Sequence, residues 1–283
     1  MIRVILLGRT GNILFQYALG RLLARRHEVP LILDASWYNH EGWREISYFL
    51  SLPIQARVVR RCSFGMRALR KLTGKHYWEY AGKPIIREPV HDQSFDPQIL
   101  ESPRNCVLFG YFQTPLYFDE IAVELRQELN NLIAPEVRST SGKHPISELT
   151  RPDSVAVHVR RGDYLKHPAF SVCDLAYYSE AMARMRSLVP GARFFIFSDD
   201  VDWCREAFRG EQATIIESGE DATNPLHDLH LMSLASHHII ANSSYSWWAA
   251  WLGAKPAQQV IMPERWYASD IKAPIDEKRW NPR

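Results

Sequence analysis

The sequence predicts an α/β fold with parallel sheets, on two observations. Short apolar segments rich in β-branched residues alternate with segments of helical periodicity along most of the 283 residues. The helical segments between successive strands are the crossovers that parallel pairing requires. Because parallel sheets bind ligands beyond the carboxyl ends of their strands, the residues that follow each strand are the functional candidates.

In the first half of the chain we expect three strands and two helices. The strands are residues 4–7, 31–34 and 106–111, and the helices are 15–26 and 118–132. The apolar start is too short for a signal peptide, so we interpret it as a buried strand ending at Gly8. Residues 134–153 are rich in Pro, Ser, Thr, Gly and charge, which predicts a boundary between domains 1–150 and 151–283.

The second half repeats the alternation more regularly. We expect strands at 154–159, 193–198, 214–217, 238–241 and 260–262, and helices at 174–189, 202–208, 228–236 and 244–252. Asp202 is the expected N-cap of the second of these helices. Trp247, Trp248 and Trp251 lie on the last helix, where we expect some to pack in the core and part of the set to face a sugar.

Composition excludes several classes of protein. Lys and Arg number 34 against 32 Asp and Glu, a net charge of +2, which argues against a dedicated nucleic-acid binder. No apolar run reaches the roughly 18–20 residues of a membrane span. The four cysteines form no CxxC pair and suggest neither a zinc site nor a disulfide framework, so a reduced cytoplasmic location is expected.

One segment has an unusual charge. Residues 46–78 hold no acidic side chain and seven Lys or Arg, interspersed with apolar residues. The commoner explanation is a solvated helix whose long side chains cover neighbouring surface. The alternative is peripheral attachment to an anionic membrane surface.

A glycine-containing turn follows the first strand, at Gly8, Gly11 and Asn12. Glycines there permit close approach of the backbone to a ligand, and the helix that follows offers free N–H groups. The spacing matches neither a dinucleotide fingerprint nor a P-loop. A simple strand-to-helix turn without a ligand is the alternative.

Two arginines follow the strand at 154–159. Arg160 and Arg161 are suited to bidentate recognition of phosphate, and their position at a strand end favours such a site. Asp163 could instead be their structural counter-ion. His158 could contact a nucleotide base or be an ordinary core histidine.

Two further strand ends carry polar residues. Asp199 and Asp200 could accept two donors from guanine, while Asp200 and Asp202 form a DxD that in many glycosyltransferases holds a divalent metal. Ser243 and Ser244 begin the helix at 244–252, where an anion or a simple N-cap would fit. Two anion-friendly strand ends in one half of the chain favour a diphosphate.

Together these segments resemble the bacterial α-1,2-fucosyltransferases of glycosyltransferase family 11. The similarity runs in order through GRTGNILFQYA (8–18), GYFQTPLYF (110–118), HVRRGDY (158–164), residues 198–203, and DLHLMSLASHHIIANSSYSWWAAW (228–251). The sequence departs from the family pattern where Arg9 and Thr10 follow Gly8 and Ile13 replaces a glutamine. Several long motifs in order are more specific than any single one.

The resemblance implies a GT-B-like fold, in which two Rossmann-type domains with parallel sheets face a central cleft. It implies inverting transfer of L-fucose from GDP-β-L-fucose to the 2-OH of a terminal galactose, in an O-antigen, a capsule or a similar glycan. The C-terminal domain would bind GDP-fucose and the N-terminal domain would lie on the acceptor side. No metal or other cofactor is expected.

The resemblance also assigns roles. Arg160 would bind the β-phosphate and act catalytically. Independently of the resemblance, Asp163 is the nominal general base because it adjoins the arginines; the alternatives are a purely structural role for Asp163 and transfer of the proton to a phosphate oxygen. The substrate-binding residues would be Gly11, Asn12, His158, Arg161, Asp199, Asp200, Ser243 and Ser244. His158 and one of the two aspartates would contact guanine, and the serines the diphosphate.

Two other functions stay open on the residues alone. One is a transferase that uses another nucleotide sugar. The other is a carbohydrate- or nucleotide-binding protein without catalysis. Release of GDP from GDP-fucose that depends on a galactoside acceptor distinguishes the transferase from the binding protein.

Overall fold

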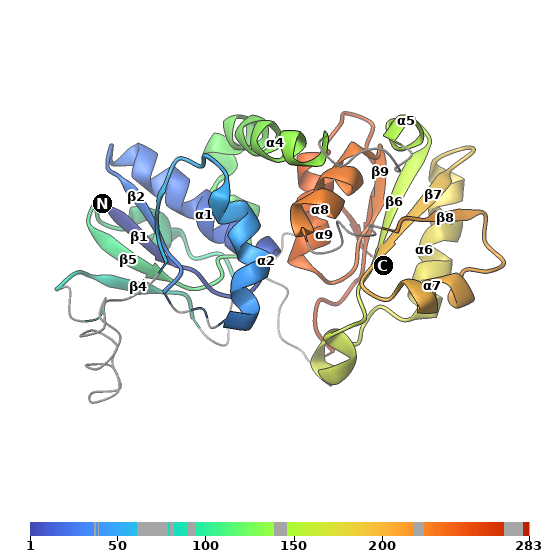
Figure 1. Cartoon of the computed structure of the whole chain (residues 1–283), viewed down its shortest axis with the longest axis horizontal. Helices are drawn as coiled ribbons and strands as arrows, with labels where there is room; N and C mark the ends of the chain where they lie inside the picture. Colours follow the sequence, from blue (N-terminus) through green and yellow to red (C-terminus); the bar gives the residue numbers. More distant parts are fainter. Residues whose placement is uncertain are drawn as a thin grey trace. The chain divides into compact units, whose positions relative to one another are not determined.

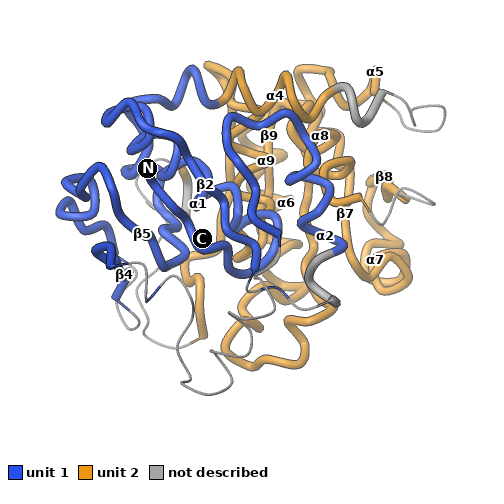
Figure 2. Tube along the Cα trace, turned by 60° about the vertical axis from the view of Figure 1, so that its left-hand side comes forward, with its two compact units in different colours: residues 1–125 blue, residues 126–283 orange. Residues whose placement is uncertain are grey.

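The computed structural model describes residues 1–36, 38, 40–60, 79, 82–89, 94–138, 146–217, 224–268 and 280–282. The chain divides into two compact units, Met1–Leu125 and Arg126–Arg283 (Figure 2). The division falls within helix α4 (Ala122–Arg138), so the boundary expected after residue 150 lies inside the second unit.

The first unit contains a five-stranded parallel sheet in the order β3-β2-β1-β5-β4 (Figure 1). Its strands are β1 (Ile2–Ile5), β2 (Leu31–Asp34), β3 (Arg57–Val59), β4 (Ile85–Arg87) and β5 (Cys106–Phe109). Its helices are α1 (Thr10–Arg26) and α2 (His40–Ser51), with short 3₁₀ turns at η2 (Pro97–Glu101), η3 (Pro115–Tyr117) and η4 (Asp119–Ile121). Helix α1 is buried from Thr10 almost continuously to Ala24, as expected of a helix that crosses between paired strands.

The second unit contains a six-stranded parallel sheet in the order β11-β10-β9-β6-β7-β8. Its strands are β6 (Ser154–Val159), β7 (Arg193–Ser198), β8 (Ala213–Ile215), β9 (His237–Ile239), β10 (Val260–Met262) and β11 (Asn281–Pro282). Its helices are α5 (Ile146–Leu149), α6 (Leu175–Leu188), α7 (Val201–Ala207), α8 (Pro225–Leu234) and α9 (Ser244–Leu252), with 3₁₀ turns η5 (Tyr164–Lys166) and η6 (Pro168–Phe170).

Strand β6 has both faces buried. Val155, Val157 and Val159 belong to a core cluster that includes residues of α6 such as Tyr178 and Met182. A strand alternates its side chains between the two faces of the sheet, so His158 lies on the opposite face, where its ring contacts that of Tyr245 in α9. The alternation of side chains along β6 therefore places His158 on the face of the sheet opposite the three valines.

Several expected elements are confirmed to the residue, namely β2, β6, β7, α9 and β10. Two expectations about side chains are wrong. The N-cap of α7 is Asp200, whose carboxylate accepts a hydrogen bond from the amide of Trp203, and not Asp202. Trp247, Trp248 and Trp251 are all at most 1% exposed, so the whole set packs in the core and none of it faces a sugar.

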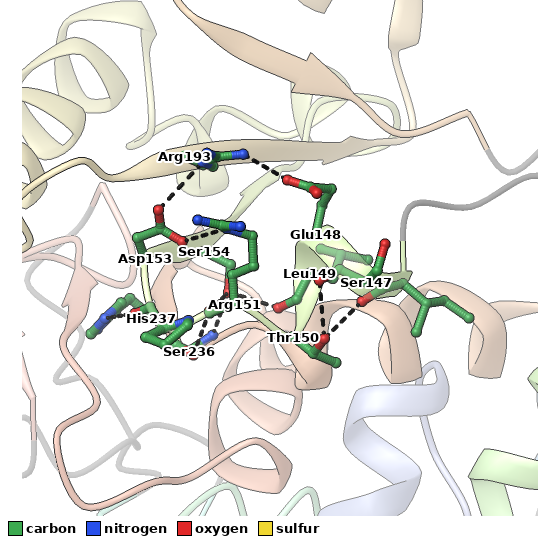
Figure 3. A network of polar contacts seen from close by, with 12 residues as sticks. Ser147, Glu148, Leu149, Thr150, Arg151, Asp153, Ser154, Arg193, Ser236 and His237 are labelled. Carbon is green, nitrogen blue, oxygen red and sulfur yellow. Dashed lines mark hydrogen bonds and ion pairs between the residues drawn. The ribbon is translucent and has the colours of Figure 1, made fainter.

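The amino ends of β6 and β7 are joined by a network of ion pairs and hydrogen bonds (Figure 3). Arg193 forms ion pairs with Glu148 at 2.7 Å and with Asp153 at 3.3 Å, and Asp153 also pairs with Arg151. Because Glu148 belongs to α5 and Arg193 begins β7, the network joins α5 to the sheet. It lies at the opposite end of the strands from the candidate site.

Among the described residues, no helix is both long and apolar enough to cross a membrane. Of the basic segment, only its first part and β3 are described, and residues 61–78 lie outside the described residues.

Candidate active site

The predicted residues of the second half gather at the carboxyl ends of three adjacent strands. His158, Arg160, Arg161 and Asp163 end β6 or follow it; Asp199 and Asp200 follow β7, and Ser243 and Ser244 follow β9. Because β9, β6 and β7 are neighbours in the sheet, these groups share one edge. This is where parallel α/β sheets bind ligands.

Arg160 is held by two carboxylates. Its guanidinium is 2.7 Å from Asp163 and 3.1 Å from Asp199, and its side chain is 18% exposed. Burial alone would lower the pKa of Arg160, but Asp199 and Asp163 outweigh it and raise the pKa above its usual value. Arg160 is therefore a permanently charged group whose position is set by its neighbours.

Arg161 lies against an aromatic ring. Its guanidinium carbon is 3.8 Å from the centre of the Trp203 ring, and its Nε is 3.0 Å from Asp200. Stacking and ion pairing together restrict a side chain that would otherwise be mobile. Sequence reasoning did not assign Trp203 to the site. A tryptophan in a helix carries no local signal that a distant arginine stacks on its ring.

Asp199 and Asp200 each use both oxygens within the protein. Asp199 accepts the main-chain N–H of Arg161 at 2.9 Å and pairs with Arg160, while Asp200 caps α7 and pairs with Arg161. A side chain at Gly162 would meet the Asp199 carboxylate at 2.7 Å, so glycine allows this close approach. The two carboxylates organise the arginines, and contact with guanine stays a prediction.

The Asp200-x-Asp202 pair does not converge. Asp200 points to α7 and Arg161, whereas Asp202 is solvent-exposed and pairs with Arg205. Among the residues that the structure describes, no group of three or more His, Cys, Asp or Glu is placed to hold a metal ion.

His158 is 5% exposed, and its Nδ1 has no hydrogen-bond partner. Burial and the charge of Arg160 lower the pKa of His158 to about 4, so the imidazole is neutral at pH 7. A neutral buried imidazole with an unsatisfied nitrogen is able to take a hydrogen bond from a polar ligand.

Ser243 is the N-cap of α9, but its side chain makes no capping hydrogen bond. Ser243 is buried and Ser244 is half-buried. The first turn of a helix leaves backbone N–H groups without helical partners, and these attract anions. Ser243 and Ser244 thus belong to the edge that carries the arginines.

In the first unit, the predicted turn is joined to a second segment. Gly8 has φ of +76°, and Asn12 packs so closely that a Cβ at Gly8 would lie 2.0 Å from its Nδ2. Gln113 donates to Asn12 Oδ1 at 2.5 Å. Gly11 lies inside the first turn of α1, which begins five residues earlier than expected.

Glu88 is a residue that sequence reasoning missed. It follows β4, is 8% exposed, and accepts the amide N–H groups of Tyr111 at 2.6 Å and Phe112 at 2.8 Å. Burial raises the pKa of Glu88 to about 7 despite these hydrogen bonds. By accepting these two amide hydrogen bonds, Glu88 holds Phe112 at a φ of +54°. The next residue along this turn is Gln113, which contacts Asn12. A carboxylate after a three-residue strand has no local sequence signal.

Comparison with known families decides the assignment. The family model described as glycosyl transferase family 11 matches residues 88–282, which include every candidate residue of the second unit. The chain belongs to glycosyl transferase family 11. The family resemblance of the sequence motifs is thereby confirmed.

Individual members of the family agree with this. The chain is 28% identical over 276 residues to an alpha-1,2-colitosyltransferase of Escherichia coli, covering 93% of this chain and 91% of the relative. It is 26% identical to the O-antigen biosynthesis glycosyltransferase WbnK of Escherichia coli, covering 96% of this chain and 97% of the relative. It is 31% identical to galactoside alpha-(1,2)-fucosyltransferase 1 of Bos taurus, covering 87% of this chain and 64% of the relative.

A solved structure supports the fold of this family 11 member. A mutant of Arabidopsis thaliana FUT1 in complex with GDP superposes with a TM-score of 0.51 at 14% identity, covering 95% of this chain and 72% of that structure. With the two parallel sheets, this likeness confirms the expected GT-B-like fold class.

Proposed function

We propose that this family 11 enzyme is an inverting galactoside 2-α-L-fucosyltransferase. It moves L-fucose from GDP-β-L-fucose to the 2-OH of a terminal galactose in a glycan of the O-antigen or capsule type. The observation that carries the proposal is the placement of Arg160 and Arg161 at one sheet edge with Ser243 and Ser244, within the region that matches the family. The colitosyl-, O-antigen and fucosyl-transferring relatives support the linkage and the glycan class.

In the proposed reaction, the acceptor oxygen attacks the anomeric carbon of fucose from the face opposite GDP. The new carbon–oxygen bond forms as the bond between fucose and the β-phosphate oxygen breaks, so the electron pair goes to GDP. Arg160 and Arg161 stabilise the charge that develops on the departing phosphate. Because the cations are already in place, little reorganisation is needed during the reaction.

The proton of the acceptor hydroxyl goes to Asp163 or to a phosphate oxygen. The carboxylate of Asp163 pairs with Arg160 in the structure, so it also acts as the counter-ion of that residue. His158 and one of Asp199 and Asp200 would bind guanine, and the turn at Gly11 and Asn12 would close on the donor. In this proposal the second unit binds the donor and the first unit lies on the acceptor side.

The test of the proposal is product analysis after incubation with GDP-fucose and a panel of galactosides. We expect GDP release that depends on the acceptor, and a product with fucose α-linked to the 2-OH of galactose. Linkage to another hydroxyl would contradict the acceptor assignment. Stabilisation by GDP without turnover on any donor would indicate a binding protein instead.

A second donor has a specific observation in its favour. The colitosyltransferase relative matches almost the full length of the chain. Colitose is fucose without its 3-hydroxyl, so GDP-fucose and GDP-colitose share every group that the arginines would bind. Competition between the two donors with one acceptor decides between them. Thermal stabilisation by UDP equal to that by GDP would contradict both.

We expect activity to be independent of divalent metal. The charge on the leaving group is met by Arg160 and Arg161, while Asp200 is bound to α7 and Arg161 and Asp202 to Arg205. Turnover in buffer treated with EDTA should therefore match turnover with added Mg²⁺. Loss of activity that Mn²⁺ or Mg²⁺ restores would overturn this expectation.

We also propose peripheral contact of the basic segment with an anionic membrane surface, on the sequence alone. Binding to vesicles of phosphatidylcholine should increase when phosphatidylglycerol is added and should weaken with salt. Replacing Arg67, Arg70 and Lys71 with glutamine should reduce it. Equal sedimentation with neutral and anionic vesicles would remove the proposal.

A further inference from the structure

Asn242 lies between β9 and α9, directly before the two serines of the candidate site, and is 2% exposed. Its Nδ2 donates to the main-chain oxygens of Phe170 and Trp266, both at 3.0 Å. Its Oδ1 lies 3.5 Å from the Cys173 sulfur, in position to accept the thiol hydrogen. Both amide hydrogens and the amide oxygen are therefore used in contacts between separate segments of the chain.

The main chain of Asn242 is used as well. Its carbonyl oxygen accepts a hydrogen bond from the Tyr164 hydroxyl at 3.1 Å. Tyr164, Phe170 and Cys173 all belong to the segment that leads from β6 to α6, whereas Trp266 follows β10. Asn242 thus joins the segments that follow β6, β9 and β10 at the carboxyl edge of one sheet.

The tip of the segment from β6 to α6 is exposed and is tied to the rest of the unit by the Ala268 amide, which donates to the Ala169 carbonyl at 2.8 Å. Residues 165–169 are all exposed, and the side chain of Leu165 is 58% exposed. At its base, the ring of Phe170 stacks on that of Tyr164 with centres 5.0 Å apart, and it also contacts the ring of Tyr267. The amide of Asn242 holds the backbone at this base.

The same segment carries the neighbours of Arg160. Asp163 pairs with its guanidinium, and the ring of Tyr164 lies 5.6 Å from the guanidinium carbon. A displacement of the segment would therefore move the counter-ion and the aromatic neighbour of the cation that faces the donor phosphate. In enzymes, a displacement of about 1 Å at such a group can lower the rate about 100-fold.

We propose that Asn242 is a positioning residue of the donor site, which holds the segment from Asp163 to Cys173 and through it the side chain of Arg160. The role of Arg160 itself rests on the proposed function. The role of Asn242 follows from its contacts, and asparagine suits it because one side chain supplies two donors and one acceptor.

The decisive variant is Asn242→Asp, which keeps the size but replaces two donors with an oxygen that faces two carbonyl oxygens. Without these donors the carbonyls of Phe170 and Trp266 lose their hydrogen bonds to Asn242, and two supports of the segment remain, from Tyr164 to the Asn242 main chain and from the Ala268 amide to Ala169. We expect kcat/KM with GDP-fucose to fall about 10- to 100-fold, with a weaker affinity for GDP. The matched control is Asn130→Asp, which removes a similar amide donor to the Leu252 carbonyl in the same unit and should leave kcat/KM within about twofold.

Two readouts report on the segment without any turnover. Trypsin should cleave the folded variant after the exposed Lys166 at least tenfold faster than the parent chain. Alkylation of Cys173 should also accelerate, because release of the segment would expose this sulfur, whereas its burial now raises the pKa of the thiol to about 12. Peptide mass spectrometry separates Cys173 from the other cysteines.

The outcomes separate this inference from the proposed function. Unchanged cleavage, or faster cleavage with unchanged kcat/KM and GDP affinity, would overturn the role of Asn242 while leaving the transferase in place. If the parent chain transfers no fucose, cleavage, alkylation and GDP affinity still decide the role of Asn242. If Asn242→Asp does not fold, Tyr164→Phe takes its place. Because it removes the hydroxyl contacts with Asn242 and Ser243 and keeps the ring beside Arg160, it should lower kcat/KM severalfold, and no change would overturn the inference.

Discussion

Replacement of Arg160 with alanine is expected to lower kcat for fucose transfer about 100- to 1000-fold, the usual effect of losing one fixed group that stabilises developing charge. The guanidinium is partly buried and held between Asp163 and Asp199, so no neighbouring cation can take its position without moving. Arg161 is held separately by Trp203 and Asp200. The measurement is the single-turnover and steady-state rate of GDP release with acceptor present.

The variant also leaves two carboxylates without their cation, so folding must be checked. Arg160→Lys keeps the charge but loses the planar fork, and we expect an intermediate rate with near-normal stability. The matched control is Arg193→Ala, which removes an arginine paired with two carboxylates at the amino end of the same sheet (Figure 3). Its turnover should be near normal. A folded Arg160→Ala enzyme within about threefold of the parent rate would contradict the assignment of Arg160, because losses of such a group are normally far larger.

The largest effect on stability is expected from Trp248→Ala. Trp248 is fully buried and packs against Trp247 and Trp251, with ring centres 5.3 and 5.0 Å away. Truncation of a buried tryptophan leaves a large cavity and lowers the free energy of unfolding by about 3–5 kcal/mol. Chemical denaturation followed by circular dichroism measures this loss.

Trp248→Phe is the control, because it keeps part of the ring volume and should cost less. If Trp248 contacted a sugar instead, alanine would raise the KM for the acceptor while leaving stability unchanged. That result would contradict the core position of this residue. The structure favours loss of stability, because the indole has no exposed surface with which to bind a ligand.

Local pattern was sufficient where an element is long, buried and bounded by clear turn residues. Strand β6 and strand β7 were predicted to the residue because each is a six-residue apolar segment in the middle of the sheet. Strands β3 and β4 were missed, since each has three residues at a sheet edge and leaves no periodic signal. Helix α1 was predicted to begin too late, because Glu45 of α2 accepts the Thr10 amide and supports a helix start that local sequence does not mark.

For the candidate site, the sequence by itself determined which polar residues follow the strands of the second unit and that they lie in motifs of one family. Chain order alone places Arg160 and Arg161 after β6, and Ser243 and Ser244 before α9. Only the tertiary structure decided what these residues contact. Asp199 reaches Arg160 because β7 pairs with β6, Asp200 and not Asp202 caps α7, and Trp248 is enclosed by the core. The physical reason is that side-chain pairing and burial depend on segments distant in sequence, whereas motifs and strand patterns are local.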